Sequence, residues 1–254
     1  MRRLVLLPLL LSVLIACGKP EPQAPPQPTE ATKASVQTPA PVVEYLAALA
    51  AVEKSKAPIS LEALFDRAEG AQAALMSITG EVAVLERYSA AEFAALQAQL
   101  RGLTLHRELD IYAQPEPPFF LALAKAHGLP SDVAFFTQYA ATWGPDLVPV
   151  YLKLRPQPTP CVRFGEGRIA PLYASWKAFA TQHPTAYAGH SAQMLADLEE
   201  ALALGTCACD GLESVRAEQA AFLKQFPDAA KAAEITARRE QLARDPDVLP
   251  VNCR

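Results

Sequence analysis

The fold is decided by a heptapeptide, AFATQHP at residues 178–184, which returns as AFLKQFP at residues 221–227. Phenylalanine and proline recur at an offset of 43 residues, and a run with helical apolar spacing follows each copy. Proline lacks a backbone donor and is favoured at the first position of a helix. Each copy therefore predicts a helix, a short turn, a proline that opens the next helix, and that helix. Two copies predict two helical hairpins whose apolar faces need neighbours.

Residues 171–245, which contain both copies, resemble the tetratricopeptide-like repeats of envelope lipoproteins that coordinate cell-wall and outer-membrane assembly. Those repeats carry a similar aromatic residue followed by an aromatic–proline pair between two helices. The resemblance implies stacked hairpins and a protein-binding role. This chain departs from the family in three ways: its period is longer than the usual ~34 residues, only two units are visible, and the Gly-x-x-Tyr pattern of the first helix is missing.

The region before the repeat, residues 42–147, is also expected to be helical. Apolar residues at spacings of three and four predict helices over 42–56 and over about 61–78. Ser89 and Glu92 form a capping box that opens a third helix. Residues 103–111 are ambiguous between strand alternation and helix. Two further helices are expected over 119–127 and from Ser131 and Asp132 to about 142.

The only sheet expected lies near residues 148–170, at the start of a C-terminal region of residues 148–254. Apolar residues alternate between Val148 and Leu154, and a Gly-Glu-Gly turn at 165–167 separates two short segments, 162–164 and 168–170, that could pair as a small hairpin. The prediction is a mainly α fold of helical hairpins with at most one small β-hairpin near 148–170.

The N-terminus has the features of an export signal. Arg2 and Arg3 precede an apolar run that is too short to span a bilayer, which needs about 20 residues. The run ends in Leu14-Ile15-Ala16-Cys17, which resembles the lipobox of bacterial lipoproteins. The resemblance implies removal of residues 1–16, lipidation of Cys17, and a lipid anchor in a membrane. An aspartate after the cysteine favours inner-membrane retention in that family, and Gly18 stands there instead. The expected location is therefore the periplasmic face of the outer membrane.

Residues 17–41 comprise the lipidated cysteine and a tether. Seven prolines stand among Gln, Glu, Ala, Thr and Lys in this segment, which buries too little apolar surface to fold. Proline-rich chain tends to extend by about 3.1 Å per residue, so the tether is expected to reach ~70 Å from the lipid surface.

The charge balance excludes one class of partner. Without Arg2 and Arg3 the chain keeps 21 Lys and Arg against 27 Asp and Glu, a formal net charge of −6. Because no basic run is available to neutralise phosphates, nucleic acid is not an expected partner.

Four cysteines remain after Cys17: Cys161, Cys207, Cys209 and Cys253. An even number in an exported chain indicates two disulfides. Direct bonding of Cys207 to Cys209 fits disulfide geometry poorly, so Cys161 and Cys253 are each expected to take one of the pair. The spacings 161–207 and 209–253, of 46 and 44 residues, favour that pairing. A zinc site of four thiolates and a redox pair at 207–209 are the alternatives.

No sequence motif identifies a catalytic, metal or cofactor site: the chain contains no HExxH, P-loop, dinucleotide-binding or nucleophile-elbow pattern. Asp197, Glu199 and Glu200 are interpreted as a solvated helix face. Trp143 and Trp176 are weighed as markers of a ligand groove. The function favoured is a helical binding or scaffold module for another envelope protein, with Tyr173, Trp176 and Tyr187 as exposed contact residues. The alternatives are an inhibitor or immunity protein of a periplasmic enzyme, using the turn at 164–168, and a hydrolase with a dispersed site.

Overall fold

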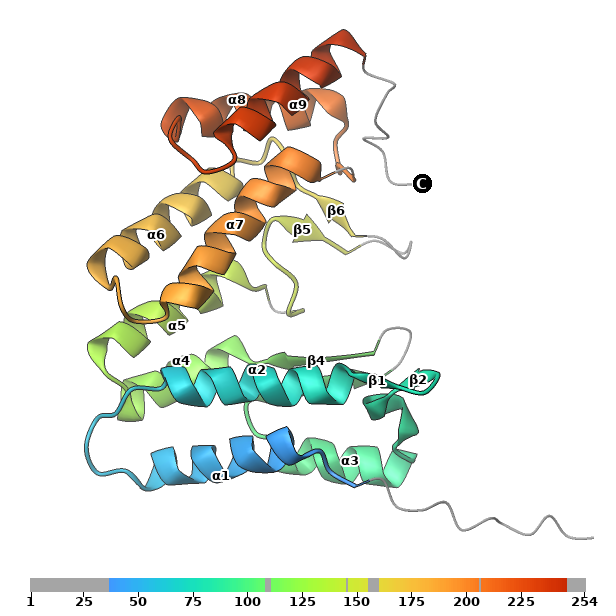
Figure 1. Ribbon diagram of the computed structural model, residues 1–254, viewed down its shortest axis with the longest axis vertical. Coiled ribbons are helices and arrows are strands. Elements are labelled where there is room, and N and C mark those ends of the chain that lie inside the picture. Colours follow the sequence, from blue (N-terminus) through green and yellow to red (C-terminus); the bar gives the residue numbers. More distant parts are fainter. Residues whose placement is uncertain (1–36, 108–110, 145, 155–159, 206, 246–254) are drawn as a thin grey trace, which may run out of the picture. The chain divides into compact units, whose positions relative to one another are not determined.

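The computed structural model describes residues 37–107, 111–144, 146–154, 160–205 and 207–245. Within these ranges the chain is mainly helical, as predicted, with nine α-helices and three two-stranded antiparallel sheets (Figure 1). The described residues belong to one compact unit. The expected signal segment, Cys17 and nearly all of the expected tether lie outside the described residues. In the described part no helix is long and apolar enough to cross a membrane.

The N-terminal helices follow the predicted spacing closely. Helix α1 (Ala40–Lys54) buries Val42, Tyr45, Leu49 and Val52 on one face, and α2 (Glu62–Met76) runs antiparallel beside it (Figure 1). Ala40 and Pro41, expected in the tether, form the first turn of α1, where proline needs no intrahelical donor. After a small sheet, β1 (Ile78–Thr79) and β2 (Val82–Ala83), and the 3-10 turn η1 (Val84–Arg87), the predicted capping box opens α3 (Ala90–Gln99).

The ambiguous residues after α3 are strands, so the expectation of at most one β-hairpin is wrong. Strand β3 (Leu103–Arg107) pairs with β4 (Ile111–Pro115), with Thr104 opposite Gln114 and His106 opposite Tyr112. Leu103, Leu105 and Ala113 are buried, whereas Thr104, His106, Tyr112 and Gln114 are only partly buried. This alternation gives the hairpin a core face and an opposite, partly open face.

A glycine fixes how the hairpin begins. Gly102 has a φ of +78°, and a Cβ at this position would overlap the ring of Phe119 at the start of α4 (Pro117–His127). The left-handed conformation and the close approach both require glycine here. Helix α5 (Pro130–Thr142) follows α4 after a short turn.

The prediction that the segments on either side of Gly165-Glu166-Gly167 pair as strands is also wrong. Strand β5 (Leu152–Lys153) pairs instead with β6 (Cys161–Val162). Ile169 already belongs to helix α6 (Ile169–Gln182), because Ile169, Leu172 and Trp176 have helical spacing and face the core.

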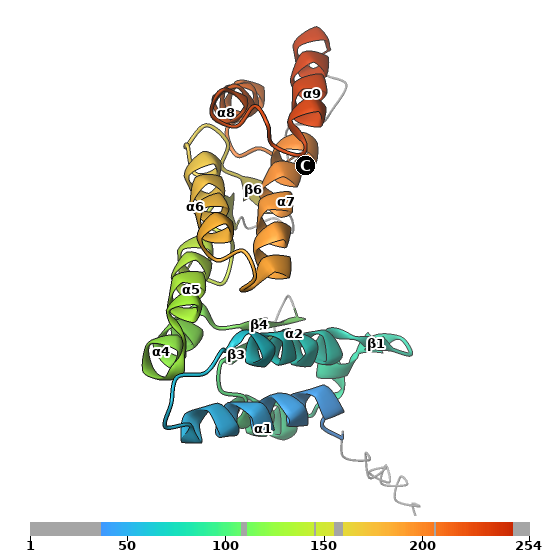
Figure 2. The same cartoon turned by 60° about the vertical axis from the view of Figure 1, so that its left-hand side comes forward.

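The heptapeptide repeat is a repeat of structure as well as of sequence. Helix α6 pairs with α7 (Ala188–Leu204), and α8 (Leu212–Gln225) pairs with α9 (Ala232–Arg244) (Figure 2). His183 ends α6 with φ −131° and ψ 62°, and Phe226 ends α8 with φ −130° and ψ 65°. The helical region is disfavoured for a residue before proline, which accounts for the common stop at these two helix ends. Pro184 and Pro227 lie in the turns and do not open the next helices.

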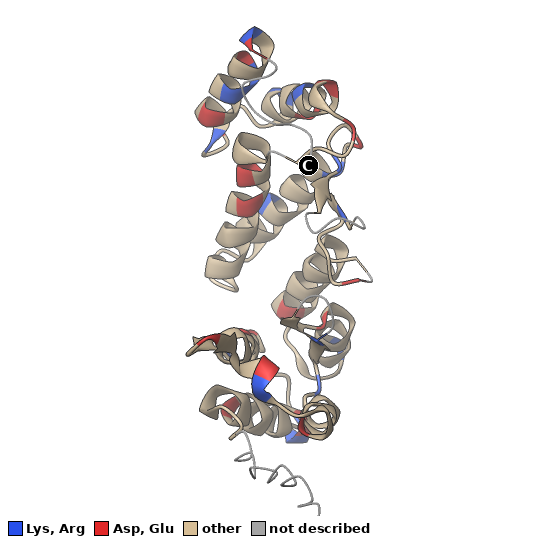
Figure 3. Ribbon diagram, turned by 90° about the vertical axis from the view of Figure 1, so that its right-hand side faces the viewer, with Lys and Arg blue, Asp and Glu red and all other residues tan. Residues whose placement is uncertain are grey.

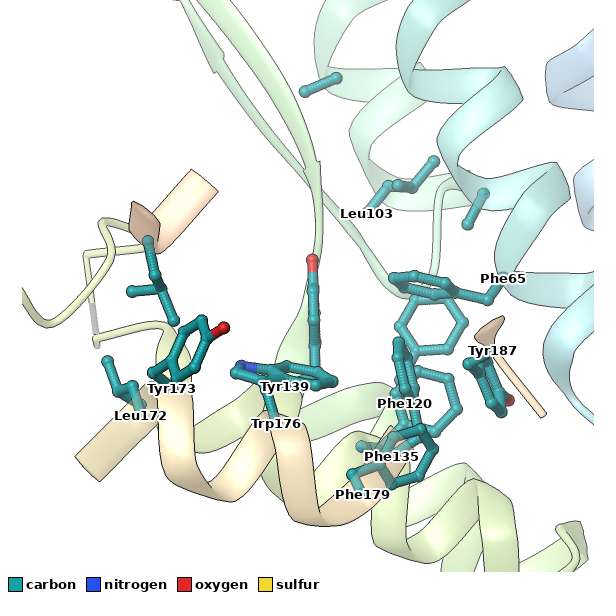
Figure 4. Close-up of a cluster of buried hydrophobic side chains, with 14 of the residues drawn as sticks. Phe65, Leu103, Phe120, Phe135, Tyr139, Leu172, Tyr173, Trp176, Phe179 and Tyr187 are labelled. Atoms are coloured by element: carbon teal, nitrogen blue, oxygen red, sulfur yellow. The ribbon is translucent and has the colours of Figure 1, made fainter. Parts of the chain in front are cut away.

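One continuous core joins the N-terminal helices to the repeat. Phe65 of α2 contacts Phe120, Phe135, Tyr139 and Tyr187 edge-on, with ring centroids 5.1–6.5 Å apart. Phe135 of α5 also stacks on Tyr187 at 3.8 Å and lies edge-on to Trp176 of α6 (Figure 4). The N-terminal region (42–147) and the C-terminal region (148–254) therefore both contribute described residues to this one core.

Buried polar side chains connect elements where hydrophobic contacts alone would not specify a geometry. The Asp132 carboxylate is fully buried and accepts hydrogen bonds from the Leu61 and Leu129 backbone N–H groups and from the Tyr187 hydroxyl. Glu199 accepts from the Tyr173 hydroxyl and from the backbone N–H groups of Ala230 and Lys231. The interpretation of Glu199 as solvated is wrong, since only 3% of it is exposed.

Candidate ligand-binding site

The three aromatic residues predicted as exposed contacts are all core residues. Tyr173 is 4% exposed, and Trp176 and Tyr187 are fully buried. Their polar atoms are satisfied inside: the Tyr173 hydroxyl donates to Glu199 at 2.6 Å, the Trp176 indole to Thr142 at 2.9 Å, and the Tyr187 hydroxyl to Asp132 at 2.6 Å. Burial is the first cause that raises the pKa of Tyr187, and the hydrogen bond to Asp132 is the second. The prediction is wrong because these side chains face neighbouring helices.

The cysteines serve as a structural clasp. Cys161 is bonded to Cys209 at a sequence separation of 48, so it takes one partner from the 207–209 pair as expected, although the matched spacing had favoured Cys207. Cys207 is disulfide-bonded as well, and Cys17 and Cys253 lie outside the described residues. Cys161 and Cys209 are therefore not thiolate ligands, and no group of three metal-binding side chains occurs among the described residues. The zinc alternative is thus contradicted.

The turn at 164–168, weighed as an inhibitory loop, is exposed at residues 165–167 and anchored at Phe164 and through its backbone. Phe164 is fully buried, and the Glu218 carboxylate accepts hydrogen bonds from the Gly165 and Gly167 backbone N–H groups. Arg163 and Arg168 both pair with Glu166, and these contacts lower the pKa of Glu166. The turn is held down against α8, and its two arginines are already matched to a carboxylate.

A cavity, called the hairpin cavity, lies on the partly open face of the β3–β4 hairpin. Its volume is about 920 Å³, near the upper end of the range usual for small-molecule and peptide sites. The hairpin supplies one wall, and α5 with the segment after it supplies another. The lining residues are Thr104, His106, Ile111, Tyr112, Gln114, Glu116, Pro117, Pro118, Ala140, Trp143, Gly144, Asp146, Leu147, Val148, Leu154 and Pro160.

Aromatic side chains line two sides of the hairpin cavity. His106 and Tyr112 stand opposite each other in the sheet, with their rings stacked at 4.8 Å. Trp143 follows the end of α5 and is partly exposed, and its indole N–H is covered from solvent without a hydrogen-bond partner in the described part of the chain. Because that nitrogen is covered, the aromatic rings, and not the indole N–H, are what a ligand in the cavity would meet.

The loop after Trp143 is held in a strained conformation at the cavity. The Gly144 N–H donates to the Val148 carbonyl, and the Leu147 N–H donates back to the Gly144 carbonyl. Leu147 has a φ of +55°, which non-glycine residues rarely adopt. Such strain persists only where the surrounding structure imposes it, and it occurs preferentially at ligand sites.

The charged side chains at the hairpin cavity are acidic. Glu116 and Asp146 line it, and its described lining includes no lysine or arginine. Elsewhere the two signs are interspersed, as on α8 and α9 (Figure 3). The cavity therefore differs in charge from these mixed surfaces.

A second, smaller cavity of about 260 Å³ is lined by His190 and Glu69, and His190 also contacts Asp66, which is not part of the lining. The Nε2 atom of His190 lies 2.8 Å from Asp66, and its Nδ1 atom lies 3.5 Å from Glu69. Burial raises the pKa of Glu69, while His190 opposes that effect. Acid–base groups thus converge here, but no serine, threonine or cysteine is among the described residues that line this cavity.

The sequence reasoning singled out Trp143 but missed the rest of the hairpin cavity. Tyr112, Glu116 and Asp146 carry no recognisable motif, and the hairpin that positions Tyr112 was ambiguous. The only available signal was the alternation of Leu103, Leu105 and Ile111 with polar residues. Comparison with protein-family models, with curated proteins and with solved structures finds no match to this chain.

Proposed function

We propose that this chain is a lipid-tethered binding module of the cell envelope, which holds a segment of another envelope protein in the hairpin cavity. The observation that carries the proposal is the cavity itself: about 920 Å³, bounded by the open face of a hairpin and lined by Trp143 and Tyr112. Concave sites with aromatic walls and a few polar groups are the usual form of a ligand site.

The sequence supports the envelope location in this proposal. The Leu14–Cys17 pattern resembles a lipobox, and the proline-rich segment after it suits a tether. The tether would let the cavity search a layer about 70 Å deep above the lipid surface. Confinement to that layer raises the effective concentration of the module around a partner in the same envelope, so moderate affinity suffices.

A matched pair of crosslinking positions tests the proposal. Leu154 lines the cavity and Leu204 lies on α7, and both are 56% exposed. A photo-crosslinking amino acid at Leu154, in the full chain in cells, should give a discrete adduct with one envelope protein, and the same amino acid at Leu204 should not.

Filling the cavity supplies the second arm. Ala140 lines the cavity, whereas its neighbour Ala141 is exposed. Ala140→Trp should abolish the Leu154 adduct, and Ala141→Trp should leave it unchanged. Equal adducts from Leu154 and Leu204, or an adduct that survives Ala140→Trp in a normally folded protein, would count against the cavity as the binding site.

A hydrolase is the second candidate, because His190 lines the smaller cavity together with Glu69 and also contacts Asp66. A histidine beside carboxylates is suited to general acid–base catalysis. Chromogenic ester, amide and glycoside substrates would test it, with His190→Ala as the control. Turnover by the wild type that His190→Ala removes without unfolding would favour the hydrolase, and turnover no faster than buffer would dismiss it for those substrates.

A further inference from the structure

We infer that the hairpin cavity recognises a cationic side chain, arginine or lysine, presented by an extended peptide segment. This inference rests on the proposed function and adds the chemistry of the ligand. Three features of the cavity support it: the sign of its charge, its aromatic wall, and its size with a partly polar lining.

The charge of the cavity favours a cation over an anion. Glu116 and Asp146 line it, without lysine or arginine among the described lining residues. The N-terminus of α4 also reaches the cavity, and a helix N-terminus normally favours anions through its free N–H groups. Here Pro117 and Pro118 have no N–H to offer, and Glu116 occupies the N-cap position. The features that would attract a phosphate or carboxylate are thus replaced by a negative charge.

The walls suit the shape of a long cationic side chain. An ammonium or guanidinium group is attracted to the face of an aromatic ring, most strongly to tryptophan. Trp143 and Tyr112 provide such rings, while Leu147 and Val148 provide apolar surface for an aliphatic stem. A neutral ligand would use the apolar surface but leave both carboxylates unmatched.

The polar lining of the hairpin cavity points to a peptide as the source of the cation, because Thr104 and Gln114 line the same cavity as the two carboxylates. A peptide backbone offers donors and acceptors to such side chains next to the cationic side chain, whereas a polyamine offers no acceptor. The volume of the cavity leaves room for residues that flank the side chain.

Binding is tested by calorimetry on the full-length lipidated protein in detergent micelles. The probes are a capped pentapeptide with one central arginine flanked by alanine and proline, and the same peptide with citrulline or glutamate at the centre. The arginine peptide should bind at least tenfold more tightly than the citrulline peptide, and the glutamate peptide should bind most weakly. Argininamide and spermidine test the free-amine source: binding of either as tight as that of the arginine peptide would overturn the assignment to a peptide.

Variants of the cavity provide the second readout. Glu116→Gln and Asp146→Asn should each weaken arginine-peptide binding by about 3- to 10-fold, while citrulline-peptide binding should change less than twofold. The two tryptophans supply an internal control, since Trp176 is fully buried. The arginine peptide should change the fluorescence of the wild type, and Trp143→Phe should remove that change.

The inference fails if the citrulline or glutamate peptide binds as tightly as the arginine peptide, or if no arginine-peptide binding is found up to about 1 mM, the weak end of specific affinities. The failure of the proposed function is distinguishable, because it is judged by the Leu154 adduct and its loss in Ala140→Trp. An adduct that depends on the cavity, together with no arginine preference, would retain the module and reject the cationic ligand.

Discussion

The Asp132→Ala substitution tests whether buried polar groups fix the packing of this fold. Asp132 is fully buried and connects three parts of the chain: the Leu61 N–H lies 3.0 Å from Oδ1, the Tyr187 hydroxyl 2.6 Å from Oδ1, and the Leu129 N–H 2.6 Å from Oδ2. Alanine removes the acceptor and leaves the three donors in place.

The expected loss follows from the burial of each donor. Leu61 and Tyr187 are both fully buried, and an unsatisfied donor in such a place costs about 1–3 kcal/mol. Leu129 is partly exposed, and loss of its contact with Asp132 costs about 1 kcal/mol, as for a helix cap. Because the carboxylate no longer has to be kept out of water, the sum is an upper range, and we expect a net loss of about 4 kcal/mol in the free energy of unfolding.

Two milder variants resolve the individual contacts. Tyr187→Phe removes one donor and retains the stacking on Phe135, so it should cost about 1.5–3 kcal/mol, the value of a hydrogen bond to a charged acceptor. Asp132→Asn retains an oxygen toward Leu61 and Tyr187 but places an NH₂ group near the Leu129 N–H. It should cost less than alanine.

Urea unfolding of the full chain, followed by far-UV circular dichroism, measures these changes from the midpoint and slope. The exposed carboxylate Asp146 supplies the control, since Asp146→Ala should change stability by no more than about 0.5 kcal/mol. If Asp132→Ala unfolds within about 1 kcal/mol of the wild type with an unchanged slope, the reasoning from buried donors is refuted.

Three further predictions concern the anchor, the clasp and the strained loop. Cys17→Ser should leave an unlipidated protein, and equal incorporation of a fatty-acid analogue into wild type and variant would contradict the lipobox assignment. Replacing both Cys161 and Cys209 by alanine should lower the free energy of unfolding by about 2–4 kcal/mol, since the loop of 48 residues corresponds to ~4 kcal/mol in the chain-entropy model; mass spectrometry of a non-reduced digest should show the 161–209 link in the wild type and none in the variant. Leu147→Gly should relieve about 1 kcal/mol of backbone strain at a φ of +55°, partly offset by the entropy of glycine in the unfolded chain. Val148→Gly, in the same loop, offers no such relief and should destabilise the protein, so a Leu147→Gly loss as large as that of Val148→Gly would show that the strain is absent.

Local signals in the sequence predicted the helices well, because each depends on residues close in the chain. The residue before Pro184 and the residue before Pro227 stop their helices in the same conformation, and this effect is local. The same holds for the Ser89–Glu92 capping box, whose two hydrogen bonds span three residues. The residue at which α7 begins depends less on its neighbours in the chain. The prediction that Pro184 opens this helix was wrong, since α7 begins at Ala188.

The site was predicted poorly because it depends on which face each residue presents to a distant element. Trp143 and Trp176 are the same residue type, yet one lies at a cavity and the other in the core. Trp176 lies at a helical position that packs on α5, whereas Trp143 lies just after the end of α5. Glu199 shows the reverse error: its neighbours Asp197 and Glu200 suggested a solvated face, but a tyrosine from α6 and the turn before α9 meet its carboxylate.

The bond between Cys161 and Cys209 also governs how the chain responds to tension. A chain held at its N-terminus and pulled elsewhere extends by about 3.4 Å for each residue released. Because the disulfide carries the load directly from residue 161 to residue 209, helices α6 and α7 lie outside the load path. The 48 residue-to-residue steps between the two cysteines, ~160 Å of contour length, stay hidden until the bond is reduced. Reduction of the Cys161–Cys209 bond would therefore lengthen the chain at constant force, and a pulling measurement would register the opening of this bond as a step of that size.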